Sequence, residues 1–150
     1  MKIVLQRVKN ALVRIDGEIY SEIGEGLLAL VGISETDNEK VIDFMCEKMA
    51  NLRIFRDEND KMNLSCLDVK GEILMISNFT LYADASHGRR PNFLKAAKPD
   101  IATKLFDYSV LKTSQIVDTV KTGVFGADMK VELLNNGPVT IILDSEEIMK

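Results

Sequence analysis

Four consecutive residues carry the side chains in this sequence that are best suited to chemistry: Ser77, Asn78, Phe79 and Thr80. They follow the apolar run Ile73–Ile76, and beyond that run large apolar residues alternate with polar ones up to Leu81. This pattern predicts one strand within residues 71–84 that passes from full burial to half burial. On such a strand, two hydroxyls and an amide would offer donors and acceptors beside an apolar wall. An ordinary solvated strand face is the alternative interpretation.

A cationic segment follows in the chain after Asp84. No acidic residue occurs between Asp84 and Asp100, whereas four cations do: Arg89, Arg90, Lys95 and Lys98. In a chain of net charge −4, this segment would attract anions locally. The small residues, glycine and proline among these cations predict a loop, and a loop that is merely solvated is the alternative.

A nucleophilic mechanism would use the Thr80 hydroxyl, which needs an adjacent general base. His87 is the only histidine and lies in the glycine-bearing loop, so its distance from Thr80 is not defined by the sequence. No group of His, Cys and Asp residues has the spacing of metal ligands, and we expect neither a metal nor a cofactor. Cys46 and Cys66 lack the spacing of a redox motif and are predicted to be reduced packing residues.

The composition predicts one globular domain that covers residues 1–150. The chain is 46% hydrophobic and 28% charged, which is close to the average of globular domains. No apolar run approaches the roughly 18 residues that cross a bilayer, and the first apolar stretch, Ile3–Leu5, is too short for a signal peptide. We therefore expect a cytoplasmic protein with no membrane partner. The negative net charge argues against DNA and other broad nucleic-acid binding.

Strands are indicated throughout the chain. The first, Ile3–Val8, places Arg7 where most strand residues are apolar. Asp16-Gly17 is typical of a tight hairpin turn, and the apolar run Leu27–Ile33 predicts a central strand covered on both faces. Further strands or extended segments are expected at residues 53–56, 62–67, 116–120, 130–134 and 139–143.

Two helices are indicated as well. Thr36 and Glu39 have the spacing of a capping box at the start of a helix that reaches Leu52. Pro99 suits the first turn of a second helix, which extends to about Lys112. The apolar side of this second helix is expected to comprise Ile101, Leu105, Phe106, Tyr108 and Val110. Many hairpin strands with two main helices predict an α/β fold with a mixed, mostly antiparallel sheet that curls toward a barrel, and the helices packed against it.

A second motif lies near the C-terminus, at Gly137-Pro138-Val139-Thr140. A proline that enters a strand cannot donate to the ladder, and a Gly-Pro bond can be cis, although a plain turn is the alternative. Together with Ser77–Leu81, this motif resembles the D-aminoacyl-tRNA deacylase family, which carries Ser-Gln-Phe-Thr-Leu and Asn-Xaa-Gly-Pro-Val-Thr. The resemblance extends through Leu5–Val8, Asn51–Phe55, Lys61–Ser65, Gly88–Pro91, Thr122–Met129 and Asn135–Thr140. Asn78 replaces the glutamine of the family.

The resemblance implies a homodimeric hydrolase that cleaves the ester between a D-amino acid, or glycine, and the terminal ribose of tRNA. It implies that Ser77–Thr80 form the catalytic segment and that the backbone N–H groups of Phe79 and Thr80 stabilise the oxyanion. It also implies that a cis Gly137-Pro138 pair from the partner subunit excludes an L side chain. The 2′-hydroxyl of the terminal adenosine would replace a protein base. Met129 and Arg7 would assist substrate binding, and the cations of residues 89–98 would bind tRNA.

A different class of function is an RNA-binding module without chemistry that uses the basic 89–98 segment. Stacking aromatic residues and a generally basic face are the expected signs of such a module, and both are weak in this sequence. Release of a D-amino acid from charged tRNA would distinguish the two classes.

Overall fold

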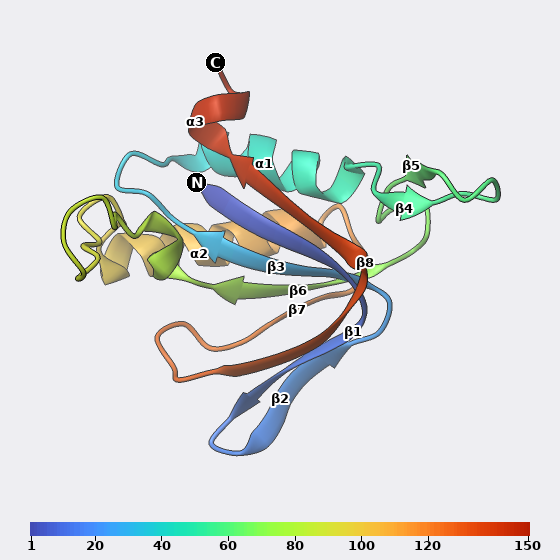
Figure 1. Cartoon of the computed structure of the whole chain (residues 1–150), viewed down its shortest axis with the longest axis horizontal. Coiled ribbons are helices and arrows are strands. Elements are labelled where there is room, and N and C mark those ends of the chain that lie inside the picture. The colour runs from blue at the N-terminus through green and yellow to red at the C-terminus, as the bar shows by residue number, and fades with distance from the viewer.

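The computed structural model describes residues 1–150 as one large sheet with helices packed against it and a small two-stranded sheet at one end (Figure 1). The strands are β1 (Lys2–Ile15), β2 (Glu18–Ile23), β3 (Gly26–Gly32), β4 (Phe55–Arg56), β5 (Met62–Leu64), β6 (Glu72–Ser77), β7 (Val120–Thr122) and β8 (Lys130–Asp144). The helices are α1 (Glu39–Asn51), α2 (Pro99–Ser114), the short α3 (Ser145–Ile148) and the 3-10 helix η1 (Phe79–Tyr82).

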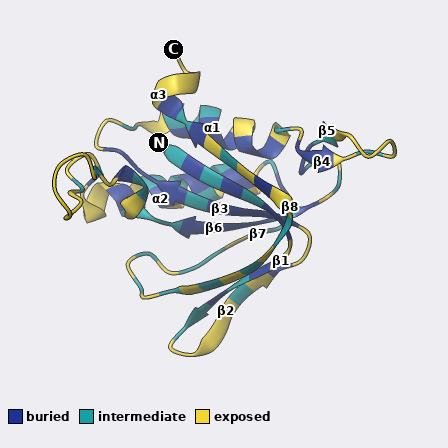
Figure 2. Ribbon diagram, in the orientation of Figure 1, coloured by how far each residue is buried: buried dark blue, intermediate teal, exposed yellow.

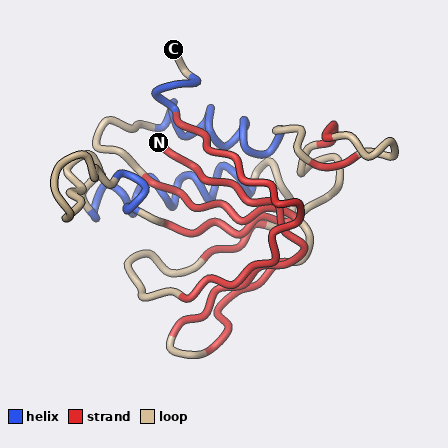
Figure 3. Tube along the Cα trace, in the orientation of Figure 1, coloured by secondary structure: helices blue, strands red, loops and turns tan.

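The large sheet has the order β2-β1-β3-β6-β7, and β8 pairs with β1. The pairs β1–β2, β1–β3 and β1–β8 are antiparallel, whereas β3–β6 and β6–β7 are parallel. The long strands β1 and β8 pair along most of their length, and together with β2 they curl away from the plane of the sheet (Figure 3). This arrangement confirms the predicted mixed, mostly antiparallel sheet that curls toward a barrel.

The curl of the sheet creates two hydrophobic cores. The larger core lies between the sheet and the helices α1 and α2, and β3 is buried along most of its length (Figure 2). Its residues Leu27, Ala29 and Val31 belong to this core. The smaller core lies on the opposite face, where Leu28 and Leu74 pack with residues of the curled half of β1. Alternate residues of β3 therefore serve different cores, which explains its unbroken apolar sequence. No helix of the chain is both long and apolar enough to cross a membrane.

Several expected elements are confirmed. Asp16 and Gly17 both have positive φ, 52° and 81°, and form the tight turn between β1 and β2. Both predicted helices are present, with Pro99 in the first turn of α2. Cys46 and Cys66 are free and buried, and burial raises the pKa of their thiols to about 11 and about 12.

The strand predicted within residues 71–84 ends at Ser77, so its continuation through Thr80 and Leu81 is wrong. The chain turns there into η1 because it packs directly across the end of β3. A Cβ atom on Gly32 would lie only 3.2 Å from the Asn78 carbonyl oxygen, so the glycine admits the close approach of η1 to β3. The alternation of polar and apolar residues therefore reflects a 3-10 helix with an exposed Phe79, 55% of whose surface is accessible.

Three further expectations are wrong in detail. The N-cap of α1 is Asn38, whose side chain accepts from the Val41 N–H, so Thr36 and Glu39 form no capping box. On α2, Phe106 is buried and Leu105, Tyr108 and Val110 pack against the core as expected, but Ile101 is exposed and the other fully buried residues are Ala102, Ser109 and Thr113. The segments 130–134 and 139–143 belong to one strand, β8, because Asn135–Pro138 forms a bulge within it rather than a turn that ends it.

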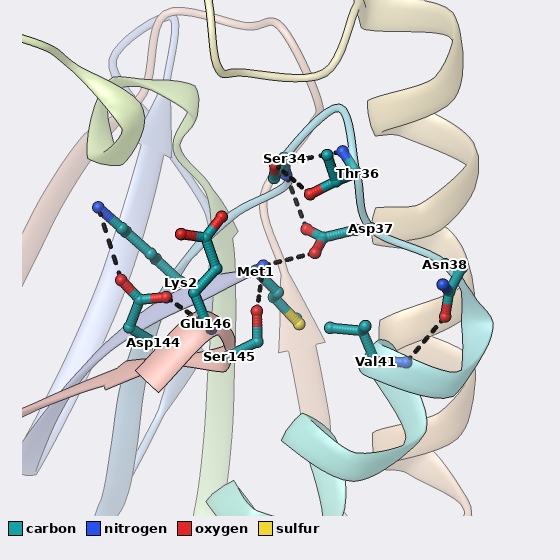
Figure 4. A network of polar contacts seen from close by, with 10 residues as sticks. All are labelled: Met1, Lys2, Ser34, Thr36, Asp37, Asn38, Val41, Asp144, Ser145 and Glu146. Atoms are coloured by element: carbon teal, nitrogen blue, oxygen red, sulfur yellow. Dashed lines mark hydrogen bonds and ion pairs between the residues drawn. The ribbon is translucent and has the colours of Figure 1, made fainter. Parts of the chain in front are cut away.

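A buried polar network joins the first residue to two distant segments (Figure 4). The Met1 ammonium group donates to Asp37 Oδ1 at 2.6 Å and to Ser145 Oγ at 2.7 Å. The second oxygen of Asp37 accepts from the Ser34 N–H, and the Ser145 N–H donates to the Met1 carbonyl oxygen. The network therefore ties β1 to the end of β3 and to α3 by charge-assisted bonds.

Replacement of Asp37 by asparagine is expected to lower the free energy of unfolding by about 3 kcal/mol, because it leaves a buried ammonium group without its counter-charge. Urea unfolding followed by circular dichroism measures this change. Asp60→Asn is the matched control, since Asp60 pairs with Arg56 at the surface and should cost less than about 1 kcal/mol. Equal, small effects of both substitutions would contradict the expectation.

Candidate active site

A cavity of about 380 Å³ opens at the edge of the sheet where β3 and β6 end. These strands are parallel, with Val31 opposite Ser77, so their C-terminal ends meet at that edge. The lining is mostly apolar and comes from β3, β6, η1, β8 and the loop before β8, and it includes Leu30, Ile76, Ser77, Asn78, Phe79, Phe125 and Met129. An apolar cavity with a few polar groups is the usual form of a small-molecule site.

The backbone of the Ser77–Thr80 segment presents two free donors. The Asn78 N–H donates to the Val31 carbonyl oxygen at 2.8 Å and so fixes the segment to the end of β3. The Leu81 N–H donates to the Asn78 carbonyl oxygen at 3.4 Å. The N–H groups of Phe79 and Thr80, at the start of η1, donate to no acceptor in the chain, as is usual for the first residues of a helix.

The side chains of the same segment contain no general base. The Thr80 hydroxyl donates to Asn78 Oδ1 at 2.5 Å, and an amide oxygen is too weak a base to activate it. His87 is exposed, and its Nδ1 pairs with the Ser86 hydroxyl at 2.8 Å. The short amide of Asn78 thus has a hydrogen-bond partner within the segment, the Thr80 hydroxyl.

Met129 forms part of the cavity wall opposite Ser77–Phe79 because a glycine makes room for it. A Cβ atom on Gly123 would lie 2.3 Å from the Met129 sulfur and 3.4 Å from Ile76 Cδ1. Gly126, with φ of 80°, forms the turn that brings this loop back toward β8. The structure therefore places Met129 in the cavity that Ser77, Asn78 and Phe79 also line.

The Gly137-Pro138 pair lies away from this cavity. Between Gln6–Thr140 and Val8–Asn135, β1 advances by two residues and β8 by five, so the pair projects from the ladder as a bulge. Along β1, this bulge lies at the level of Arg7. Ser77 lies at the level of Ile3, because Ser77 pairs with Val31 and Val31 pairs with Ile3. Ile3 and Arg7 are four residues apart, which corresponds to about 13 Å along β1. The three strand spacings from β8 to β6 separate the bulge from Ser77 by about 14 Å more across the sheet.

The bulge is held from both sides. Asn135 closes its base, because its amide oxygen accepts from the Val139 N–H at 2.8 Å and its amide nitrogen donates to the Val139 carbonyl oxygen. Arg7 donates through Nε to the Asn136 carbonyl oxygen at 2.8 Å. The Gly137-Pro138 peptide bond is cis, and Gly137 has φ of 156° with its Cβ position blocked by Val139. Glycine is therefore required at this position.

Arg7 is buried, with 2% of its surface exposed, and it lies next to the bulge rather than in the cavity. Its Nη1 donates to the Ile54 carbonyl oxygen at 2.7 Å. Burial lowers the pKa of the guanidinium, and the charge of Arg56 lowers it further. Arg7 therefore positions Asn136 and the residues that follow it.

The predicted cationic segment lies next to the cavity. The ring of Phe93 packs edge-on against that of Phe79, with centroids 5.1 Å apart. The bridge between Asp84 and Asn92 closes the loop, and all four cations are exposed and form no ion pair: Arg89, Arg90, Lys95 and Lys98. The structure thus connects the segment to Phe79.

Sequence reasoning missed three residues that shape the site. Gly32 allows η1 to cross the end of β3, and a glycine at the end of an apolar strand was its signal. Phe93 supports Phe79. Tyr82, the last residue of η1, is buried; burial raises the pKa of its phenol, and its hydroxyl has no hydrogen-bond partner in the chain. Nothing in the local sequence distinguished these two aromatic residues.

The family model described as D-Tyr-tRNA(Tyr) deacylase matches residues 4–144. A D-aminoacyl-tRNA deacylase from Caldicellulosiruptor bescii is 53% identical over 148 residues, which are 99% of this chain and 99% of that protein.

Two solved structures are similar as well. The c-Myc DNA unwinding element binding protein has a TM-score of 0.92 and 39% identity over 96% of this chain and 98% of that one. A probable eukaryotic D-amino acid tRNA deacylase has a TM-score of 0.81, with 95% and 97% of the chains covered, and at 16% identity it supports the fold alone.

Substitution of Gly32 by alanine is expected to displace η1, because the new methyl group would press on the Asn78 carbonyl oxygen and on Leu81. We expect faster hydrogen exchange of the Asn78 amide and a loss of about 1 to 3 kcal/mol of stability. Gly24→Ala is the control, since its Cβ would meet only Glu72 Oε1, at 3.4 Å. Unchanged exchange at Asn78 in the Gly32 variant would show that η1 does not depend on this contact.

Proposed function

Because this chain belongs to the D-Tyr-tRNA(Tyr) deacylase family, we propose that it hydrolyses the ester that joins a D-amino acid, or glycine, to the terminal ribose of tRNA. The observation that carries the proposal is the pair of free N–H groups of Phe79 and Thr80, next to a cavity of about 380 Å³. Chiral proofreading of aminoacylated tRNA is the role that follows.

The two N–H groups would stabilise the oxyanion that forms when water attacks the ester carbonyl. Both belong to η1, which the Asn78–Val31 hydrogen bond and the contact with Gly32 hold in place. One fixed donor of this kind is worth about 3 to 4 kcal/mol in the transition state. Main-chain donors serve this purpose whatever side chain stands at position 78, so Asn78 is compatible with activity.

The attacking water would be positioned by the 2′-hydroxyl of the terminal adenosine. The residues at the cavity offer no imidazole, and their one carboxylate, that of Asp128, is exposed and paired with Lys130 at 3.0 Å. The Thr80 hydroxyl is bonded to Asn78 rather than to a base. The 2′-hydroxyl neighbours the ester on the same ribose, so proximity can substitute for a protein base.

A homodimer would complete the site. The Gly137-Pro138 bulge is far from the cavity of its own chain, so it can exclude an L side chain only in a partner's cavity. One face of the sheet is suited to such a partner. On this face Ile142, which is 70% exposed, pairs with Val4, and Val4 pairs with Leu30, which lines the cavity. An apolar strip that leads from an exposed strand to a cavity fits a two-fold contact.

The tRNA would approach along the exposed cations of residues 89–98, which Phe93 and Phe79 connect to the cavity. Met129 would bound the terminal nucleoside, and Arg7 would act by positioning the bulge. The same cations would serve a binding module without chemistry. Release of amino acid from D-tyrosyl-tRNA, with L-tyrosyl-tRNA as the control, tests the proposal, and binding of both without release would favour the binding module.

The absence of a side-chain nucleophile predicts that Thr80→Ala retains activity within about tenfold, which corresponds to about 1.4 kcal/mol. A D-aminoacyl-tRNA that ends in 2′-deoxyadenosine should bind normally and be cleaved slowly. Single-turnover kinetics on both measures these effects. If the Thr80→Ala variant is inactive and the deoxy substrate is cleaved at the normal rate, Thr80 is the nucleophile.

Ile142→Asp is expected to give an inactive monomer, because it places a charge in the proposed contact. Sedimentation across a concentration series, with D-tyrosyl-tRNA cleavage on the same samples, measures both properties. Leu111→Asp is the control, since Leu111 is 58% exposed on α2 and lies outside the sheet face. A wild-type monomer with full activity would exclude the two-chain site.

A further inference from the structure

A second cavity, of about 250 Å³, adjoins the Gly137-Pro138 bulge and is lined by an unusual set of charges. Three cations face it: Arg7, Lys9 and Arg56. A single carboxylate, that of Glu25, also lines it. The remaining lining consists of Phe55, Val69 and Asn136.

Arg7 is the unusual member, because it is a buried cation that forms no direct ion pair, although the charges of Glu25 and Asp60 act on it from a distance. No carboxylate lies within ion-pair distance of its guanidinium. Its Nε and Nη1 donate to backbone carbonyl oxygens, and its Nη2 donates to no acceptor in the chain. A buried charge with an unused donor is costly unless a partner completes it.

The other two cations are available at the surface of this cavity. Lys9 is exposed and forms no ion pair. Arg56 uses Nη1 for Asp60 at 3.0 Å, and that pair is exposed to solvent. The repulsion between Arg56 and Arg7, which contributes to the lowered pKa of Arg7, would be relieved by an anion between them.

We propose that this cavity, formed by Arg7, Lys9 and Arg56, binds a phosphate group of the tRNA acceptor end. The inference rests on the proposed function, which places the neighbouring Gly137-Pro138 bulge at the aminoacyl ester of a tRNA bound to the partner subunit. The phosphodiesters next to that ester are the nearest fixed anions of such a substrate. Arginine guanidinium groups suit them, because a fork of N–H donors matches the phosphate oxygens.

The phosphate would link substrate binding to the bulge. The Arg7 guanidinium, which lines the cavity, also donates from Nε to the carbonyl oxygen of Asn136, directly before Gly137. A tRNA seated on this cavity would therefore hold the bulge in place against the amino acid. A free aminoacyl nucleoside, which has no phosphodiester, would lack this contact.

The test uses Lys9→Gln, Arg56→Gln and the double variant, with Lys40→Gln as the control because Lys40 is exposed on α1. We expect the double variant to bind uncharged tRNA about three- to tenfold more weakly. The slope of log affinity against log salt should fall by about 0.7 to 0.9 for each phosphate that the variant no longer neutralises. Cleavage of D-tyrosyl-adenosine should be unchanged, while cleavage of D-tyrosyl-tRNA should show a raised KM.

Three results would overturn the proposal: wild-type affinity and salt slope in the double variant, equal losses on D-tyrosyl-adenosine and D-tyrosyl-tRNA, or dissociation of a dimer by the two substitutions. The second would mean that the cations only support the bulge, and the third that a partner side chain fills the cavity. Failure of the wild-type protein to release D-tyrosine would refute the proposed function instead, and the binding measurements would still decide on the phosphate site.

Discussion

The architecture depends on the bend of β1 near Arg7. Up to Leu5, alternate residues of β1 pack into the core beneath the helices, and from Val8 onward its buried residues belong to the second core. The register shifts of β8 on either side of Val8 permit this change of side. Arg7 is buried at this bend. Its guanidinium is held there by the carbonyl oxygens of Asn136 and Ile54, to which it donates. The Gly137-Pro138 bulge follows from the same geometry, because β8 accommodates the bend with its extra residues.

The same bend separates the parts of the proposed site. It directs the bulge outward at one end of the sheet, while the parallel strands β3 and β6 deliver Ser77–Thr80 and the cavity at the other. Within one chain these parts cannot meet, and a second copy is the economical way to unite them. The exposed Ile142 and the aligned Val4 and Leu30 lie between the two ends, which is where such a copy would pack.

The class of the fold could be predicted from the sequence because the local preferences of its segments agree with the structures that they adopt in the complete fold. The Asp16-Gly17 turn, the buried run of β3 and the two helices are each determined by neighbouring residues. Predictions failed where a distant contact decides. The strand stops at Ser77 because Gly32, far away in the chain, admits η1, and β8 continues through Pro138 because β1 pairs on both sides of the bulge. For the site, the order of residue types pointed to Ser77–Thr80, and the structure places Ser77, Asn78 and Phe79 in the lining of one cavity. Met129 lines the same cavity, but only the family resemblance had pointed to it. Phe93 and Tyr82 could not be found, since their importance lies only in what they pack against.

A site built on main-chain donors tolerates different amino-acid substitutions from a site built on side chains. The proposed oxyanion donors, the N–H groups of Phe79 and Thr80, would depend on the path of η1, which the Asn78 N–H, Gly32 and the buried Tyr82 hold in place. The shorter Asn78 side chain reaches the Thr80 hydroxyl and stabilises the same turn. Discrimination against L-amino acids would likewise depend on the backbone of the bulge, which Arg7 and Asn135 support from behind. In such a design, substitutions that shift the backbone should be more harmful than those that alter the exposed side chains, and the charged residues around the bulge would be available to bind the nucleic acid.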